Sequence, residues 1–147
     1  NLQLTRPSIG PWWTPMALLA ASVGTNLVVW GLARLLGPSS LSEFEPLSGP
    51  GSVILLTSVG AIGAYFTYWF IAQITRNPTL WYLVLSIIVL ILSFIPDIDY
   101  PASTPGYSTF AIIILMVLHI TAGLVDVGLL IWIIWLAAAR WRMLVLI

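Results

Sequence analysis

The sequence predicts an all-α integral membrane protein, a four-transmembrane-helix bundle with both termini in the cytoplasm. The first observation is compositional, because 60% of the residues are apolar, 7% are charged and the mean hydropathy is +1.05. So few charges cannot coat a water-facing surface, and the surrounding solvent must therefore be lipid. The second observation is a set of four apolar runs close to the 20 or so helical residues that cross a hydrocarbon core of about 30 Å. The third is that the charges between these runs segregate by sign.

The four predicted spans follow one another with short connections, and we expect a single four-helix membrane domain over residues 1–147. The spans cover about residues 12–36, 52–75, 79–95 and 108–139. Each of the first three ends at a proline-containing turn, and the third, which is the shortest, is expected to stop at Pro96. The fourth exceeds the thickness of a bilayer, so it must tilt, bend or protrude. The chain begins at Asn1, and we expect the first run to be a retained helix and not a cleaved signal.

The charged residues sort onto two sides of the membrane. Four arginines lie on one side and four acidic residues on the other: Arg6, Arg76, Arg140 and Arg142, against Glu43, Glu45, Asp97 and Asp99. The positive-inside rule places the arginine side in the cytoplasm, and we expect a multi-pass protein of the bacterial cytoplasmic (inner) membrane. Arg34 is the exception, and we expect its side chain to snorkel to the interface and pair with Glu43 or Glu45.

Aromatic residues mark the expected membrane boundaries, because amphipathic rings favour the headgroup level. The expected anchors of the inner interface are Trp12, Trp13, Trp69, Trp81, Trp132, Trp135 and Trp141, and those of the outer interface are Tyr100 and Tyr107. In the first outer loop, Leu41, Phe44 and Leu47 are predicted to lie in the interface as a lid. In the second, Asp97 and Asp99 indicate a solvated turn more strongly than a cation site.

Polar residues inside the spans predict a layer near the middle of the membrane. Asp126 is the most informative, because an ionisable side chain at that depth costs about 2.5 to 3.5 kcal/mol on insertion scales and faces a partner or a watered cavity. His119 precedes it by seven residues on the same helical face, too far away for contact, and Gly123 leaves room between them. The predicted layer consists of Asn26, Tyr65, Ser86, His119 and Asp126. Because hydrocarbon offers no hydrogen-bond partners, these groups should face one another.

Three interpretations of this layer remain open. Polar contacts between transmembrane helices act as glue worth about 0.6 to 2 kcal/mol each. Alternatively, Asp126 and His119 form a proton or ion relay, or bind a polar headgroup such as a quinone carbonyl. In the third interpretation, His119 is an axial ligand to a haem or chlorophyll-type pigment. No metal cluster is expected, and lipid, quinone or pigment is the kind of molecule that such a layer would contact.

Small residues on the second span predict tight helix packing. Gly60, Gly63 and Ala64 form a stripe in which Gly60 and Ala64 fit a small-xxx-small pattern. The same stripe could instead dock another subunit. Gly123 on the fourth span is a further expected packing position.

Several function classes are disfavoured. The chain has no cysteine, which excludes disulfides and thiolate chemistry. It contains no phosphate-binding loop or hydrolase signature, and its five dispersed arginines cannot follow a nucleic-acid backbone. We therefore expect no enzyme and no nucleic-acid partner.

The second half of the chain carries a recognisable pattern. One helix opens at Trp81, and the last helix contains the stretch Met116-x-x-His119 followed by small residues up to Gly123. This pattern resembles an uncharacterised family of small four-helix bacterial membrane proteins, a domain of unknown function. The resemblance implies the four-helix layout and interest in His119, and it implies no activity.

Two functional hypotheses follow. The first is a small non-catalytic accessory or structural subunit that packs against a larger bacterial membrane complex, respiratory or photosynthetic, with membrane lipids and other membrane-protein subunits as partners. The alternative is an independent oligomeric carrier or channel for protons or a small lipophilic molecule, with Asp126 and His119 at its centre. A single-histidine pigment or haem binder is a further alternative.

Overall fold

The computed structural model describes the backbone of residues 11–145 and the side chains of residues 11–139. It contains four α-helices, α1 (Thr14–Leu36), α2 (Pro50–Ile74), α3 (Pro78–Ile98) and α4 (Thr109–Val145), and two short 3-10 helices, η1 (Ser39–Ser42) and η2 (Glu45–Leu47). No strand occurs between residues 11 and 145. Each α-helix holds a segment that is long and apolar enough to cross a membrane. The predicted all-α fold is confirmed, and the protein is a multi-pass membrane protein.

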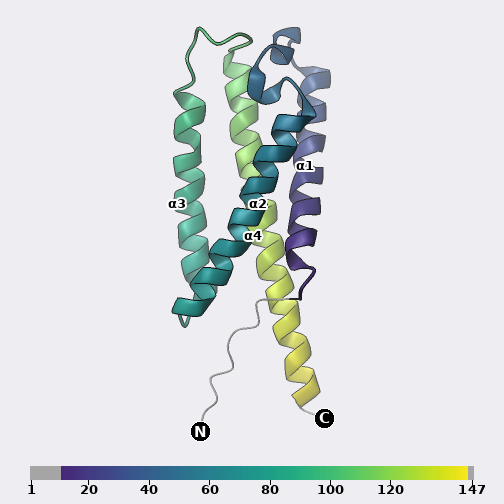
Figure 1. The fold of residues 1–147 in the computed structure, drawn as a ribbon, viewed down its shortest axis with the longest axis vertical. Helices are drawn as coiled ribbons and strands as arrows, with labels where there is room; N and C mark the ends of the chain where they lie inside the picture. Colours follow the sequence, from purple (N-terminus) through teal and green to yellow (C-terminus); the bar gives the residue numbers. More distant parts are fainter. Residues whose placement is uncertain (1–10, 146–147) are drawn as a thin grey trace.

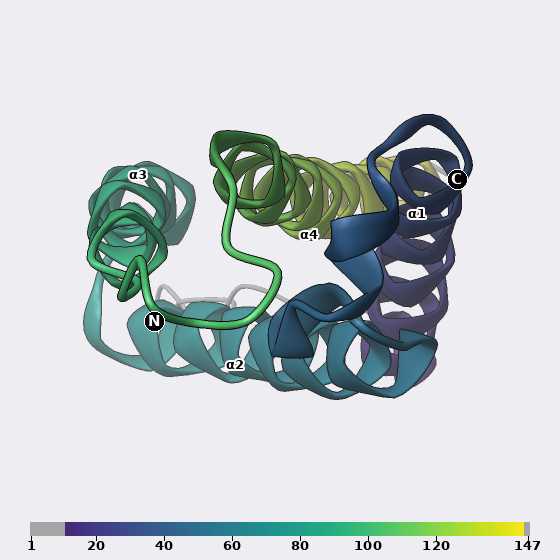
Figure 2. The same cartoon turned by 90° about the horizontal axis from the view of Figure 1, so that it is seen from above.

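The four helices form an open bundle (Figures 1 and 2). Seen from above, α1 and α3 lie at opposite ends of the bundle, with α2 and α4 between them (Figure 2). The connections that contain η1 and η2, and the one between α3 and α4, lie at one end, which we call the loop end. The start of α1, the α2–α3 turn and the end of α4 lie at the other, which we call the terminal end (Figure 1). At the terminal end α4 extends beyond the other helices, so the long fourth span protrudes.

Several helix boundaries differ from the sequence prediction: α2 begins at Pro50 and α4 continues to Val145, and the start of α1 and the end of α3 also move. Helix α1 begins at Thr14 and not at Trp12, with a proline in its first turn, where a missing N–H costs nothing. Helix α3 passes through Pro96 and ends at Ile98, and the Asp99 N–H still donates to the Ile95 carbonyl oxygen. A proline in the last turn interrupts few of the helix's own hydrogen bonds. The extra turn carries Asp97 onto the bundle.

The loop end is closed by side chains from the α1–α2 connection. Leu41, Phe44 and Leu47 are at most 1% exposed and form a core cluster with residues of α1, α2 and α4. These three side chains are therefore buried between the helices at the loop end and do not lie in the membrane interface. The two loops also touch, because a Cβ on Gly106 (φ +72°) would lie 2.4 Å from the Phe44 backbone nitrogen. Tyr100, expected at the interface, packs edge-on against Phe44 at 5.0 Å between ring centroids.

Arg34 does not make the predicted ion pair. Its guanidinium carbon lies 6.0 Å from the centroid of the Trp30 ring, a cation–π distance. Within the described part of the chain, neither Glu43 nor Glu45 approaches Arg34 within ion-pair distance. The two acidic side chains sit on η-helices that fold inward over the bundle end, which carries them away from the exposed face of α1.

The tryptophans expected as inner anchors are exposed wherever their side chains are described. Trp12 is 87% exposed and Trp135 is 65% exposed, and Trp13, Trp69, Trp81 and Trp132 are also exposed. The side chain of Trp141 lies outside the described residues. Exposed rings on the bundle surface can reach the headgroup layer, so membrane anchoring stays the prediction for these residues.

Candidate intramembrane binding site

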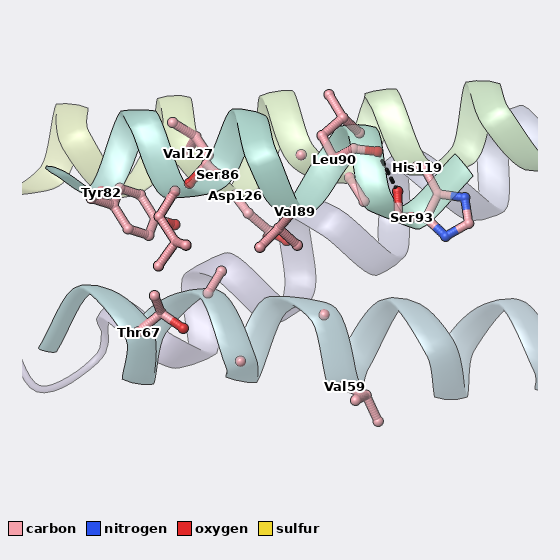
Figure 3. A pocket seen from close by; sticks show the side chains of 16 residues that line it. Val59, Thr67, Tyr82, Ser86, Val89, Leu90, Ser93, His119, Asp126 and Val127 are labelled. Carbon is pink, nitrogen blue, oxygen red and sulfur yellow. Dashed lines mark hydrogen bonds between the residues drawn. The ribbon is translucent and has the colours of Figure 1, made fainter. Parts of the chain in front are cut away.

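A cavity of about 350 Å³ lies between α2, α3 and α4 (Figure 3). Each helix contributes one face, with lining residues three or four positions apart. The lining residues are Val59, Gly60, Gly63, Ala64 and Thr67 of α2; Tyr82, Leu85, Ser86, Val89, Leu90 and Ser93 of α3; and His119, Ala122, Gly123, Asp126 and Val127 of α4. The walls are mostly apolar. Tyr82 and His119 lie towards opposite ends of the cavity, with Asp126 between them (Figure 3).

Small residues create the hollow. A Cβ built on Gly60 or Gly63 would meet no heavy atom within 4 Å. The predicted tight packing at these two positions is therefore wrong, because the glycine face of α2 borders the cavity and not a neighbouring helix. Gly123 differs, since a Cβ there would make an ordinary contact of 3.8 Å with Leu90 Cδ1 of α3. Helix α3 thus rests on α4 near Gly123, while α2 stands apart from both at Gly60 and Gly63.

Asp126 is the one carboxyl group among the described residues that line the cavity. It is 4% exposed, and the Ser22 hydroxyl of α1 donates a hydrogen bond to Asp126 Oδ1. Among the described residues, no hydrogen bond reaches Asp126 Oδ2. The carboxyl group is therefore held from the α1 side and bordered by the cavity on the other. Sequence analysis missed Ser22, although it lies one helical turn before Asn26 and so on the same face of α1.

Asn26 belongs to the helix interface and not to the cavity. Its Nδ2 donates to Thr57 Oγ1 of α2 at 2.9 Å and to the Leu118 carbonyl oxygen of α4 at 3.3 Å. These two contacts join three helices, while Asn26 Oδ1 is buried without a partner among the described residues. Thr57 was also missed from the sequence. The hydroxyl group of a threonine in an apolar helix can donate to a backbone carbonyl oxygen of its own helix as readily as it can contact another helix.

Tyr82 is a cavity residue that the sequence analysis did not identify. Its side chain is 1% exposed, and its ring packs edge-on against Tyr68 of α2 at 5.3 Å between centroids. The Tyr82 hydroxyl is buried and has no hydrogen-bond partner within residues 11–139. Ser86, which was predicted, follows one turn later on the same face and also lines the cavity. An unpartnered hydroxyl in hydrocarbon is costly, so this group is a candidate ligand contact.

His119 is fixed by α3. Its Nδ1 lies 3.0 Å from the Leu115 carbonyl oxygen and 2.9 Å from Asp97 Oδ2. The ring N–H is aligned with the carbonyl oxygen, whereas Asp97 Oδ2 has no aligned hydrogen bond, so the carboxylate acts on the ring by its charge. Asp97 is 5% exposed, so the predicted solvated turn is wrong for this residue. The cause is the extra turn of α3 beyond Pro96, and Asp99 alone stays exposed.

The predicted polar layer is thus split. Ser86, His119 and Asp126 line the cavity, while Asn26 and Tyr65 do not. Tyr65 is half-buried and packs beside the cluster around Leu18 and Tyr82. Among the described side chains, no arginine or lysine lines the cavity. No three histidine, aspartate or glutamate side chains of this part of the chain gather closely enough to share a metal ion.

Comparison with known proteins identifies the family of the chain. No curated protein and no solved structure matches it. Residues 8–140 match the sequence profile of DUF6069, a family of unknown function. The match spans both the bundle and the cavity, and it confirms the resemblance to an uncharacterised family of small four-helix membrane proteins. The chain therefore belongs to the DUF6069 family.

Proposed function

We propose that this protein binds a small lipophilic molecule with a polar group and carries it within the membrane. The observation that carries this proposal is the cavity between α2, α3 and α4, which holds Asp126 and the unpartnered Tyr82 hydroxyl in mostly apolar walls. Its volume of about 350 Å³ lies within the range of small-molecule sites. Apolar walls with a few placed polar groups are also typical of such sites.

The energetics of the polar groups support occupation by a ligand. A buried hydroxyl without a hydrogen bond costs about 1 to 3 kcal/mol. The Tyr82 hydroxyl group has no described hydrogen-bond partner, and Asp126 has one described donor, Ser22. A ligand with a matching polar group would satisfy both, while its apolar part would contact Leu85 and Val89. The binding energy would then come from groups that the fold leaves unsatisfied.

The position of the cavity supports entry from the bilayer. Helices α2 and α3 meet at the turn that contains Arg76 and diverge towards the loop end (Figure 1). Lining residues on this side, such as Val59, Gly63 and Val89, are exposed. A lipophilic molecule could therefore enter between α2 and α3 without crossing the closed loop end.

An accessory subunit of a larger bacterial membrane complex is the second candidate. The observation that favours it is the open space at Gly60 and Gly63, which would accept a helix of another subunit. For either candidate we propose the bacterial cytoplasmic membrane, with both termini in the cytoplasm, because Arg76 and the α4 positions Arg140 and Arg142 lie at the terminal end. Proton conduction, and haem or pigment ligation by His119, stay predictions.

Native mass spectrometry of the protein from its own membranes tests the two candidates. A ligand carrier is expected as a monomer or homo-oligomer with a bound small molecule that denaturation releases. Gly63→Leu, which fills the cavity, should abolish that extra mass. Gly24→Leu is the matched control, because Gly24 has equally open surroundings on α1 and does not line the cavity. Other subunits at fixed stoichiometry, with no small molecule sensitive to Gly63→Leu, would overturn the carrier and favour the accessory subunit.

A further inference from the structure

We propose that the ligand of this cavity is a lipophilic organic cation, with its charged centre beside Asp126. This inference rests on the proposed binding function and names the chemical class of the ligand. It depends on two observations: the one-sided support of the Asp126 carboxyl group and the charge of the cavity lining.

The Asp126 carboxyl group is arranged to receive a partner from the cavity. Ser22 donates to Oδ1 from α1, and the described residues supply no hydrogen bond to Oδ2. A carboxyl group in hydrocarbon needs a counter-charge or several hydrogen bonds to remain ionised. No arginine or lysine of the described residues lines the cavity, and the one imidazole of the lining, His119, lies towards the end of the cavity with Asp97 as its acidic neighbour. A cationic ligand would supply the counter-charge.

The other ionisable group of the lining does not compete for this role. His119 Nδ1 lies 2.9 Å from Asp97 Oδ2 and 3.0 Å from the Leu115 carbonyl oxygen, so its positive form already has an acidic neighbour. The two carboxylates and one imidazole give this region at most one positive charge against two negative ones. An anionic ligand such as a lipid phosphate or a fatty-acid carboxylate would lack a counter-charge in the cavity.

Tyr82 can contact either a cation or a neutral carbonyl compound. The residue is 1% exposed and its hydroxyl group has no described partner, so the hydroxyl oxygen can turn a lone pair towards an ammonium group, and its O–H can donate to a carbonyl oxygen. A quinone would instead place carbonyl oxygens, which are acceptors, against the carboxylate acceptor of Asp126. The Asp126 carboxylate, and not the hydroxyl groups of the lining, thus matches a positive centre better than an acceptor.

Binding of three probes to the purified full-length protein in detergent tests the inference. The probes are tetraphenylphosphonium, tetraphenylborate, which has the same shape and the opposite charge, and the neutral decylubiquinone. We expect saturable binding of the phosphonium cation by equilibrium dialysis, no saturable binding of the borate, and loss of cation affinity by about thirtyfold or more in Asp126→Asn. Asp99→Asn removes an equal charge from the exposed loop end and should bind the cation as the native protein does.

The outcomes separate this inference from the proposed function. If decylubiquinone binds and is lost in Gly63→Leu while the phosphonium cation does not bind, the cavity is a ligand site and the cation assignment is overturned. If no probe binds and no small molecule co-purifies, both are overturned. Cation binding that persists in both Asp126→Asn and Gly63→Leu would place it outside the cavity and overturn the assignment. Should Asp126→Asn fail to fold, loss of cation binding in Gly63→Leu but not in Gly24→Leu supports it, and retention overturns it.

Discussion

Helices α1 and α3 have similar lengths and opposite relations to the rest of the bundle. The buried residues of α1 form one stripe with mostly four-residue spacing: Thr14, Leu18, Ser22, Asn26 and Ala33. Helix α3 has two buried residues, Tyr82 near its start and Asp97 near its end. The first helix is therefore held along its length, and the third is held at its two ends with the cavity beside it.

The polar groups of the two helices also differ in how they are satisfied. On α1, Ser22 donates to Asp126 and Asn26 donates to Thr57 and Leu118, so the stripe is bonded to α2 and α4. On α3, the Tyr82 hydroxyl and Asp97 Oδ2 lack hydrogen bonds within the described residues. The polar donors of α1 thus join it to α2 and α4, although Asn26 Oδ1 has no described partner, whereas on α3 Asp97 is paired by charge with His119 and the Tyr82 hydroxyl group remains unpartnered.

The mean hydropathy of a helix does not predict how much of that helix is buried in the bundle. The most apolar window of α3 has a mean hydropathy of 2.3 and is 6% buried, whereas that of α1 has a mean hydropathy of 1.7 and is 22% buried. In a bilayer an apolar side chain gains nothing from leaving lipid, because lipid tails are equally apolar. Burial follows polar and small residues that find partners: α4, whose window has a mean hydropathy of 2.4, is 22% buried, whereas the almost equally apolar α3 is left at the edge.

The largest expected effect comes from truncating the buried stripe of α1. Leu18 is fully buried, and Leu18→Ala should lower the free energy of unfolding by about 2 kcal/mol, at the low end of the range for core leucines because lipid replaces water in the transfer step. Leu92→Ala removes the same atoms from α3, where Leu92 is 54% exposed, and should cost less than about 0.5 kcal/mol. Steric trapping in bicelles measures both. Equal losses would mean that α3 is packed as tightly as α1.

The polar contacts of α1 should rank second. Asn26→Leu keeps the size of the side chain but removes the donors to Thr57 and Leu118, and we expect a loss of about 1 kcal/mol. Ser86→Ala, the matched change on α3, should cost less than about 0.5 kcal/mol because Ser86 borders the cavity. The same unfolding assay compares the two variants. A larger loss for Ser86→Ala would place the stabilising polar network on the cavity side.

The attachment of α3 at the loop end should respond to Asp97→Asn. We expect a loss of about 0.5 kcal/mol, typical of a partly exposed ion pair, together with a broader separation of α2 and α3. Because the chain has no cysteine, spin labels at Leu55→Cys and Ile91→Cys report that separation by pulsed electron paramagnetic resonance without background labelling. The control Asp99→Asn should leave the distance distribution unchanged. An unchanged distribution in Asp97→Asn would show that His119 does not hold α3.

The four helices could be predicted because twenty apolar residues and a proline turn specify a span almost alone. The cavity could not, because it depends on how each helix is rotated about its axis. In lipid the apolar residues give little information on rotation, since they face outwards and inwards alike. Asp126 and His119 were predicted as site residues because an ionisable side chain inside a membrane span is energetically costly and needs a partner. Tyr82 was missed because a tyrosine near the end of a span is equally typical of the membrane–water interface. Asp97 was misplaced because Pro96 indicated a helix end three residues too early.

The smallest effect on stability is expected at Tyr82, and it is the sharpest test of the comparison between the helices. Tyr82→Phe keeps the edge-on contact with Tyr68 and removes a buried hydroxyl that has no partner, so stability should change by less than about 0.5 kcal/mol or rise. Tyr82→Ala removes the ring as well and should cost up to about 2 kcal/mol, because here too lipid replaces water in the transfer step; this control shows that the unfolding assay is sensitive at this position. A hydroxyl that stabilises nothing in the empty bundle but whose removal weakens ligand binding belongs to the site. If Tyr82→Phe is clearly destabilised and binds tetraphenylphosphonium as the native protein does, the hydroxyl serves packing, and α3 resembles α1 more than its exposed surface indicates.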